Sequence, residues 1–126
     1  MSSNSGRLPL KDAFMRELIV ESDATRGYVL GVRGAALLAA FPAFEAAGSY
    51  GNGPAWAALA EYLLATSPTL TGVHLDDQSD AFLAYANEEA TLQKLRAQLI
   101  DTVSNDSKLR AAVAAARERG FGEGDL

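Results

Sequence analysis

Few side chains in this sequence could do chemistry, and the most suggestive pair is His74 and Asp76. On a strand, a spacing of two residues would place them on one face, which could suit a general base and its orienting carboxylate. The pair could also begin a metal site, but one imidazole with strand-spaced carboxylates matches no specific ligand pattern. A small enzyme or metal-binding domain around His74 is therefore one hypothesis for the function, without a catalytic set behind it.

Other sequence signatures of catalytic and cofactor sites are missing. Asp76, Asp77 and Asp80 lack the spacing, the glycine and the distal glutamate of a calcium loop. The glycine-rich segment 48–53 has no lysine nearby and is expected to follow a helix, so it fits neither a P-loop nor a dinucleotide-binding turn. The sequence has no cysteine and no G-x-S-x-G motif. We therefore predict that the protein is not an enzyme and has no catalytic, cofactor-binding or metal-binding residues.

Charge is distributed unevenly along the chain. The net charge is −5, and residues 34–93 contain neither lysine nor arginine. An acidic block of this length repels nucleic acid and attracts basic protein surfaces. We therefore predict a protein partner and no nucleic acid, although the acids could also serve only to solvate the surface. The candidate partner-binding residues are Asp76, Asp77 and Asp80, with Glu45 and Glu61 as weaker candidates.

Glycines concentrate just before the only tryptophan, which indicates a sharp corner. Gly48 is placed to end one helix, Gly51 and Gly53 permit left-handed backbone, and Pro54 suits the first turn of the next helix. Apolar residues follow at helical spacing from Trp56 onward. We expect Trp56 to be buried and the corner to contain at least one residue at positive φ.

Hydrophobic patterning predicts two β-hairpins and several helices. Strands are expected at 16–22 and 27–33, joined by the turn DATRG, and at 69–75 and 81–87, joined by the acidic turn DDQSD. Helical content predicts a helix within 34–48 that is broken near Pro42, and another from about Pro54 to Thr66. Two more helices should follow an N-cap at Asn87, separated by SNDS and ended at Gly120. This order, β-β-α-α-β-β-α-α, predicts an α+β fold in which helices cover an antiparallel sheet of about four strands.

Length and hydropathy bear on organisation and location. The 126 residues fit one domain, 1–126, in which residues 1–8 are expected to be flexible. No segment approaches the roughly 18 apolar residues of a membrane span, and the N-terminal residues lack the apolar core of a signal peptide. We expect a cytoplasmic protein that contacts no membrane.

Two blocks of the sequence carry a family resemblance. The first is an F-x-x-x-G and G-N-G-x-x-W pattern formed by Phe44, Gly48, Gly51, Asn52, Gly53 and Trp56. The second is an aspartate-rich turn leading into a strand, formed by Asp76, Phe82, Ala84 and Tyr85. With these blocks the chain resembles the Immunity protein 51 family of bacterial polymorphic toxin systems, from about Val29 to Leu99. It departs from that pattern where Ser49 is inserted beside Tyr50 and where the turn reads DDQSDA.

The resemblance implies a function without chemistry of its own. Proteins of this kind are made beside a toxin and neutralise it by binding. Many such toxins attack nucleic acids and carry basic active-site clefts, which an acidic partner fits. The resemblance thus implies a cognate toxin that acts in the cytoplasm, such as a nuclease. An interaction adaptor of the same fold, unrelated to toxins, is the alternative.

Overall fold

The computed structural model describes residues 10–49 and 51–121. The segment 1–8, expected to be flexible, and Tyr50 lie outside the described residues. Within them the chain forms five helices and four strands. Their bounds are α1 (Leu10–Glu17), β1 (Ile19–Asp23), β2 (Gly27–Arg33), α2 (Ala35–Ala46), α3 (Gly53–Ala65), β3 (His74–Gln78), β4 (Ala81–Ala86), α4 (Glu89–Val103) and α5 (Asp106–Glu118).

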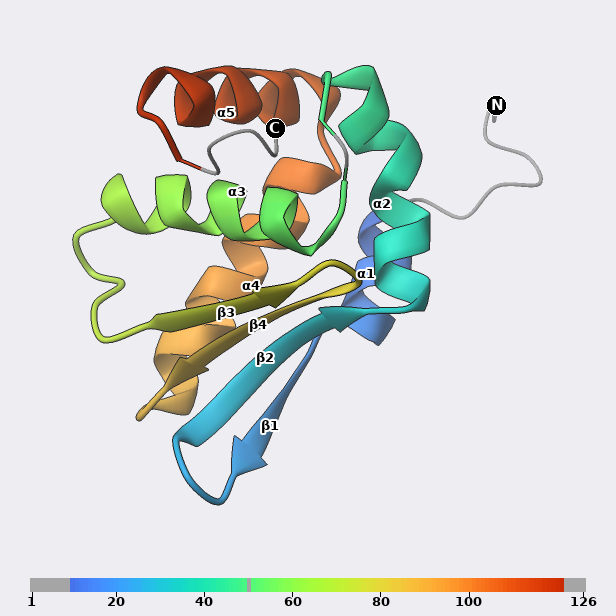
Figure 1. Ribbon diagram of the computed structural model, residues 1–126. Helices are drawn as coiled ribbons and strands as arrows, with labels where there is room; N and C mark the ends of the chain where they lie inside the picture. The colour runs from blue at the N-terminus through green and yellow to red at the C-terminus, as the bar shows by residue number, and fades with distance from the viewer. Residues whose placement is uncertain (1–9, 50, 122–126) are drawn as a thin grey trace.

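The four strands form one antiparallel sheet in the order β1–β2–β4–β3 (Figure 1). The hairpins β1–β2 and β3–β4 therefore lie side by side, and β2 pairs with β4 from Tyr28↔Ala86 to Arg33↔Ala81. This confirms the predicted α+β class and the predicted element order, apart from the additional helix α1. Strand β3 is therefore an edge strand of the sheet.

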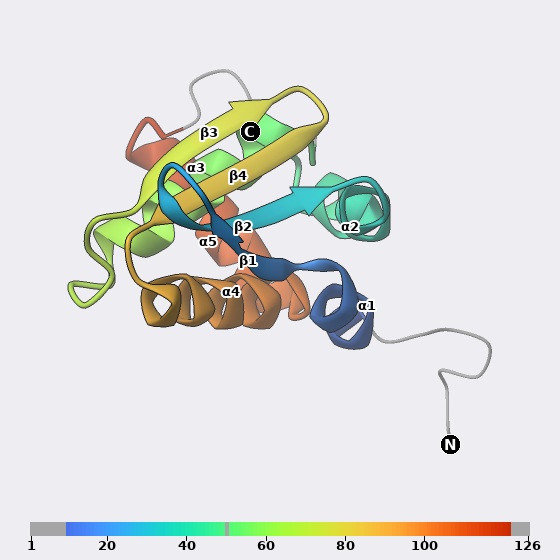
Figure 2. The same cartoon turned by 90° about the horizontal axis from the view of Figure 1, so that it is seen from below.

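Helices cover one face of this sheet and leave the other open. Figure 1 shows α3 above the sheet and α4 behind it, and Figure 2 shows the strands from below, in front of α3 and α5. Alternation along the central strands follows this division. The fully buried side consists of Leu30, Val32, Phe82 and Ala84. The opposite side, which is only partly buried, consists of Val29, Leu83 and Tyr85.

The first predicted strand began too early, because residues up to Glu17 form α1. Leu18 is fully buried at the junction between α1 and β1. The Arg96 side chain of α4 donates to the Leu18 carbonyl oxygen at 2.6 Å and to that of Met15 at 2.8 Å. A cation therefore binds the free carbonyls at the C-terminal end of α1, which stabilises a short helix. The residue pattern around α1 could not predict this contact, because Arg96 lies 78 residues from Leu18 in the sequence.

The predicted break at Pro42 was also wrong, because α2 continues through it. A proline at this position removes one N–H, whose acceptor would have been the carbonyl of Leu38. Leu38 is 77% exposed, so this lost bond lies on the solvent side of the helix, where water can replace it. The helix therefore tolerates the proline.

The second hairpin has different strand bounds and a shorter turn than predicted. The strand expected at 69–75 begins only at His74, and Asp76, Asp77 and Gln78 belong to β3 rather than to the turn. Gly72, with φ 75°, interrupts the extended segment before it. The turn itself contains only Ser79 and Asp80, because Gln78 already pairs with Ala81. Charged residues are tolerated there since β3 is an edge strand.

The helix boundaries after β4 fall close to the predicted ones. The N-cap of α4 is Glu88 rather than Asn87. The break at SNDS is confirmed, and within it the Asn105 side chain accepts a bond from the Lys108 N–H at 3.0 Å, capping α5. Gly120, with φ 78°, ends α5 as predicted, and the Phe121 N–H donates to the Ala116 carbonyl oxygen at 2.9 Å.

Candidate protein-binding surface

The chain between α2 and α3 makes the predicted corner. Gly48 has φ 84°. It ends α2 in a Schellman motif, in which the Ser49 N–H donates to the Phe44 carbonyl oxygen at 2.8 Å. Gly51 has φ 70°, in the left-handed region that favours glycine. The helix end at Gly48 and the residue at positive φ are thus both confirmed.

Gly53 is needed for a different reason from the predicted one. It is not among the glycines at positive φ and instead forms the first residue of α3. A Cβ atom at Gly53 would lie 1.7 Å from the carbonyl oxygen of Gln78 and 2.3 Å from that of Ala81. The Gly53 N–H also donates to the Ser79 carbonyl oxygen at 3.2 Å. Only glycine therefore lets α3 begin directly against the β3–β4 turn.

The remaining residues of the corner connect it to the core. The Asn52 side chain accepts a bond from the Ala55 N–H at 3.1 Å, which caps α3. Trp56 is fully buried, as predicted. Its ring lies 5.2 Å from the ring of Phe44 and 6.0 Å, edge-on, from the ring of Phe14. The two sequence blocks are therefore joined in space, since the corner contacts the hairpin turn through Gly53.

The three aspartates of the β3–β4 hairpin lie at or near its turn, which is the end that contacts Gly53. Asp76 pairs with Leu83 and lies on the open face of the sheet, whereas Asp77 pairs with the buried Phe82 and lies on the helix side. Asp80 is in the turn, and all three residues are exposed. This hairpin end is therefore anionic on both faces and at its tip.

The weaker acidic candidates come from other elements. Glu45 is exposed in the last turn of α2, and Glu61 is exposed in α3. The structure thus distributes the five predicted carboxylates over three elements. In the described part of the chain the one ion pair joins Lys108 and Asp101. None of the five candidate carboxylates therefore forms an ion pair with a lysine or arginine among the described residues.

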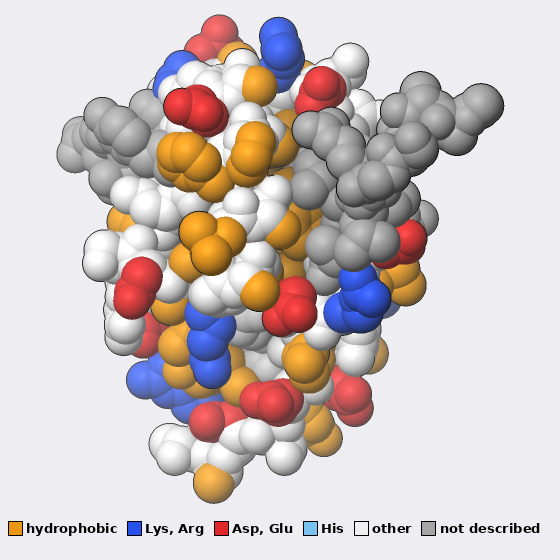
Figure 3. Space-filling model, turned by 90° about the vertical axis from the view of Figure 1, so that its right-hand side faces the viewer, with side chains coloured by type: hydrophobic (Ala, Val, Ile, Leu, Met, Phe, Trp, Pro, Cys, Tyr) orange, Lys and Arg blue, Asp and Glu red, His pale blue; other side chains and the backbone are white. Residues whose placement is uncertain are grey.

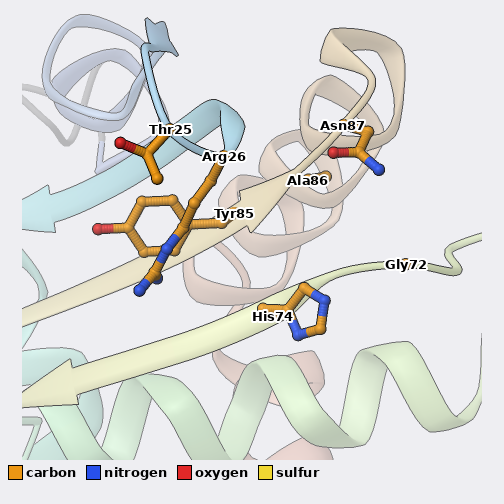
Figure 4. A pocket seen from close by; sticks show the side chains of 7 residues that line it. All are labelled: Thr25, Arg26, Gly72, His74, Tyr85, Ala86 and Asn87. Atoms are coloured by element: carbon orange, nitrogen blue, oxygen red, sulfur yellow. The ribbon is translucent and has the colours of Figure 1, made fainter.

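A pocket of about 530 Å³ opens where the β1–β2 turn meets the ends of β3 and β4. Arg26 lies across the ring of Tyr85, with its guanidinium carbon 4.3 Å from the ring centroid (Figure 4). His74 lies beside them on β3, and Asn87 follows β4. No acidic side chain is among the residues that line this pocket, which are Thr25, Arg26, Gly72, His74, Tyr85, Ala86 and Asn87.

His74 and Asp76 lie on the same face of β3, as their spacing predicted. The strand register places them opposite Tyr85 and Leu83, both on the open side. Both side chains are exposed. Within residues 10–49 and 51–121, no three histidine, aspartate or glutamate side chains gather in a way that could hold a metal ion.

A second exposed surface lies on α2. Leu38 and Phe41 are 77% and 46% exposed, although both are large apolar residues. Figure 3 shows apolar side chains along the middle of the molecular face on the α2 side, with charged side chains above and below them. This helix face is a second surface that could contact a protein.

Arg26 and the pocket around Tyr85 are not predicted from the sequence. The sequence places Arg26 only in a turn, and Tyr85 only in a strand that carries part of the family pattern. The usable signal was the segment from Asp23 to Gly27, whose aspartate and glycine are typical of a tight turn. The position of this turn over Tyr85 depends on the pairing of β2 with β4, which sequence patterning alone did not reveal.

Comparison with known proteins places the chain in a family. A family model described as Immunity protein 51 matches residues 17–118, more than half of the 126-residue chain. Searches of curated proteins and of solved structures returned no match. None of the helices in the described segments is both long and apolar enough to span a bilayer.

Proposed function

The chain belongs to the Immunity protein 51 family, and we propose that it binds a cognate bacterial toxin and neutralises it without catalysis. The family match over residues 17–118 is the observation that carries this proposal. We further propose that the toxin acts in the cytoplasm and has a basic active-site cleft, as a nuclease does. The immunity protein would act in the same compartment.

The β3–β4 hairpin is the proposed contact with the toxin. Asp76, Asp77 and Asp80 are exposed on its two faces and its tip, and none is paired with a described cation. A narrow anionic element of this kind can enter a cleft that binds phosphates. Glu45 and Glu61 would lie at the rim, where charges mainly change the association rate.

The corner supports this role because it holds the hairpin in place. Gly53 contacts the turn through its N–H and through the close approach of α3 to Gln78 and Ala81. A hairpin that is already ordered loses less conformational entropy on binding than a mobile loop does. The carboxylates are therefore presented in a fixed arrangement.

The first experiment identifies the partner. The toxin domain encoded next to this chain is expressed from an inducible promoter, with and without the immunity protein, and survival and binding of the purified proteins are measured. We expect protection and a stable complex. If the cells die even when the immunity protein is present, or if the purified proteins form no complex, the proposal is contradicted and an adaptor unrelated to toxins is favoured.

The second experiment tests the hairpin. The triple variant Asp76→Asn, Asp77→Asn, Asp80→Asn should fold normally, because Asn resembles Asp in strand and turn preference. Steering by charge raises association rates by about 10- to 1,000-fold. We expect the association rate at low salt to fall roughly tenfold and to depend less on ionic strength.

A matched control makes the same change in net charge on the helical side. The variant Asp101→Asn, Asp106→Asn, Glu118→Gln alters three exposed acids of α4 and α5. Its association rate should fall much less than that of the hairpin variant. Equal effects of the two triple variants would place the contact elsewhere, and the exposed apolar face of α2 would be examined next.

A further inference from the structure

The β1–β2 turn holds Arg26 in a fixed position on the open face of the sheet. The Asp23 carboxylate accepts bonds from the N–H groups of Thr25 at 3.2 Å and of Arg26 at 2.7 Å. Gly27 has φ 93°, and a Cβ atom there would lie 2.8 Å from the Ala86 carbonyl oxygen. The turn is therefore closed onto the end of β4, directly beside Tyr85.

Arg26 has a stacking partner but no ionic partner in the described part of the chain. Its guanidinium lies 4.3 Å from the centre of the Tyr85 ring. The ion pair found among the described residues involves Lys108 and Asp101 instead. A stacked guanidinium keeps its planar edge available for two parallel hydrogen bonds to a carboxylate.

The surroundings of Arg26 also favour an anion. His74 can add a second side chain with an N–H donor, and the Asn87 amide and the Thr25 hydroxyl line the same pocket of about 530 Å³. Two acids lie close to this pocket: Asp23, whose carboxylate accepts bonds from the N–H groups of Thr25 and Arg26, and Asp76, two residues from His74 on the same face of β3. Neither lines the pocket, so its lining differs in charge from the acidic hairpin of the same protein.

We propose that this pocket receives an aspartate or glutamate side chain of the toxin, with Arg26 as the residue that binds it. This inference rests on the proposed toxin-binding function. It adds a second contact, at Arg26, to the contact proposed for the acidic β3–β4 hairpin. Acidic residues alone would attract many basic clefts, whereas a desolvated cation disfavours every partner that lacks an acid at the matching position. Arg and Tyr are also the residue types that most often dominate binding energy at interfaces.

The test compares charge reversals in two places with the purified toxin domain as the probe. Arg26→Glu changes the pocket, and Arg110→Glu makes the same change at an exposed position on α5, a helix that packs on α3 and α4 rather than on the sheet. Thermal unfolding of both variants verifies that they are folded. We expect Arg26→Glu to raise the dissociation constant about 100-fold, mainly through faster dissociation, and Arg110→Glu to change it less than about threefold.

A set of toxin variants in which each surface acid is changed to lysine then identifies the partner residue. At least one of them should restore binding to Arg26→Glu while binding the unaltered protein less well. If Arg26→Glu behaves like Arg110→Glu, or if no acid reversal restores binding, the pocket does not hold a toxin carboxylate, while the toxin-binding function stands. If the unaltered protein binds no toxin, the proposed function fails, and this inference fails with it.

Discussion

Replacing Gly53 by alanine tests whether close packing of the corner against the hairpin is what requires glycine. Intrinsic preference points the other way, since alanine favours a helix by up to about 1 kcal/mol over glycine. The structure opposes this gain, because the new Cβ would lie 1.7 Å and 2.3 Å from two backbone carbonyl oxygens. Backbone atoms cannot rotate away as a side chain can, so α3 or the hairpin must shift.

The magnitude follows from the cost of overpacking. Inserting a methyl group into a packed site costs about 1–3 kcal/mol and sometimes more. The contact with two carbonyls puts Gly53→Ala at the upper end, about 3 kcal/mol, which is a large part of the roughly 5–15 kcal/mol of a small domain. We expect a fall in melting temperature of about 10 °C or more.

The assay is urea unfolding followed by fluorescence, because Trp56 is the only tryptophan and is fully buried. Gly31→Ala is the control: Gly31, like Gly53, is not at positive φ, and a Cβ atom there would meet only the end of the Arg33 side chain, at 3.1 Å. It adds the same methyl group where the neighbouring atoms can move. A Gly53→Ala variant no less stable than Gly31→Ala would refute the argument that the hairpin turn excludes a side chain.

Two further predictions concern the same corner. Trp56→Ala should cost about 3–5 kcal/mol, because it removes a fully buried ring packed on Phe44 and Phe14; circular dichroism during heating measures this, and a loss below about 1 kcal/mol would contradict it. Asn52→Ala should cost about 1 kcal/mol by removing the cap bond to the Ala55 N–H. Asn105→Ala, which removes the equivalent cap of α5, should cost a similar amount in the same urea titration but leave toxin binding unchanged. An Asn52→Ala variant as stable as the unaltered protein would count against the cap.

The parts of the fold that sequence predicted well are those specified by nearby residues. Helix α3 has its cap, its proline and its apolar stripe within one segment. The hairpin β1–β2 has alternating strands on both sides of a short polar turn. The glycine ends of α2 and α5 were correct because a Schellman motif needs only its own helix and the residues that follow it.

The errors occurred where distant contacts decide the local structure. Helix α1 depends on Arg96, which is 78 residues from its acceptor Leu18. The bounds of β3 depend on its pairing with β4, so acidic residues that were predicted to form a turn belong to an edge strand. Gly53 resembled a residue chosen for its backbone freedom, but the constraint comes from the hairpin turn that packs against it.

On the open face of the sheet, the acidic residue Asp76 of the β3–β4 hairpin lies next to the Arg26 pocket. Asp76 and His74 are two residues apart on β3, opposite Leu83 and Tyr85, and Arg26 covers Tyr85. A partner that docks its basic cleft on the hairpin would therefore bring its neighbouring surface to the Arg26 pocket. Charge on the hairpin accelerates association with any basic surface, whereas the pocket determines how long the complex lasts. Loss of the hairpin acids should consequently slow the formation of the complex, and loss of Arg26 should shorten its lifetime.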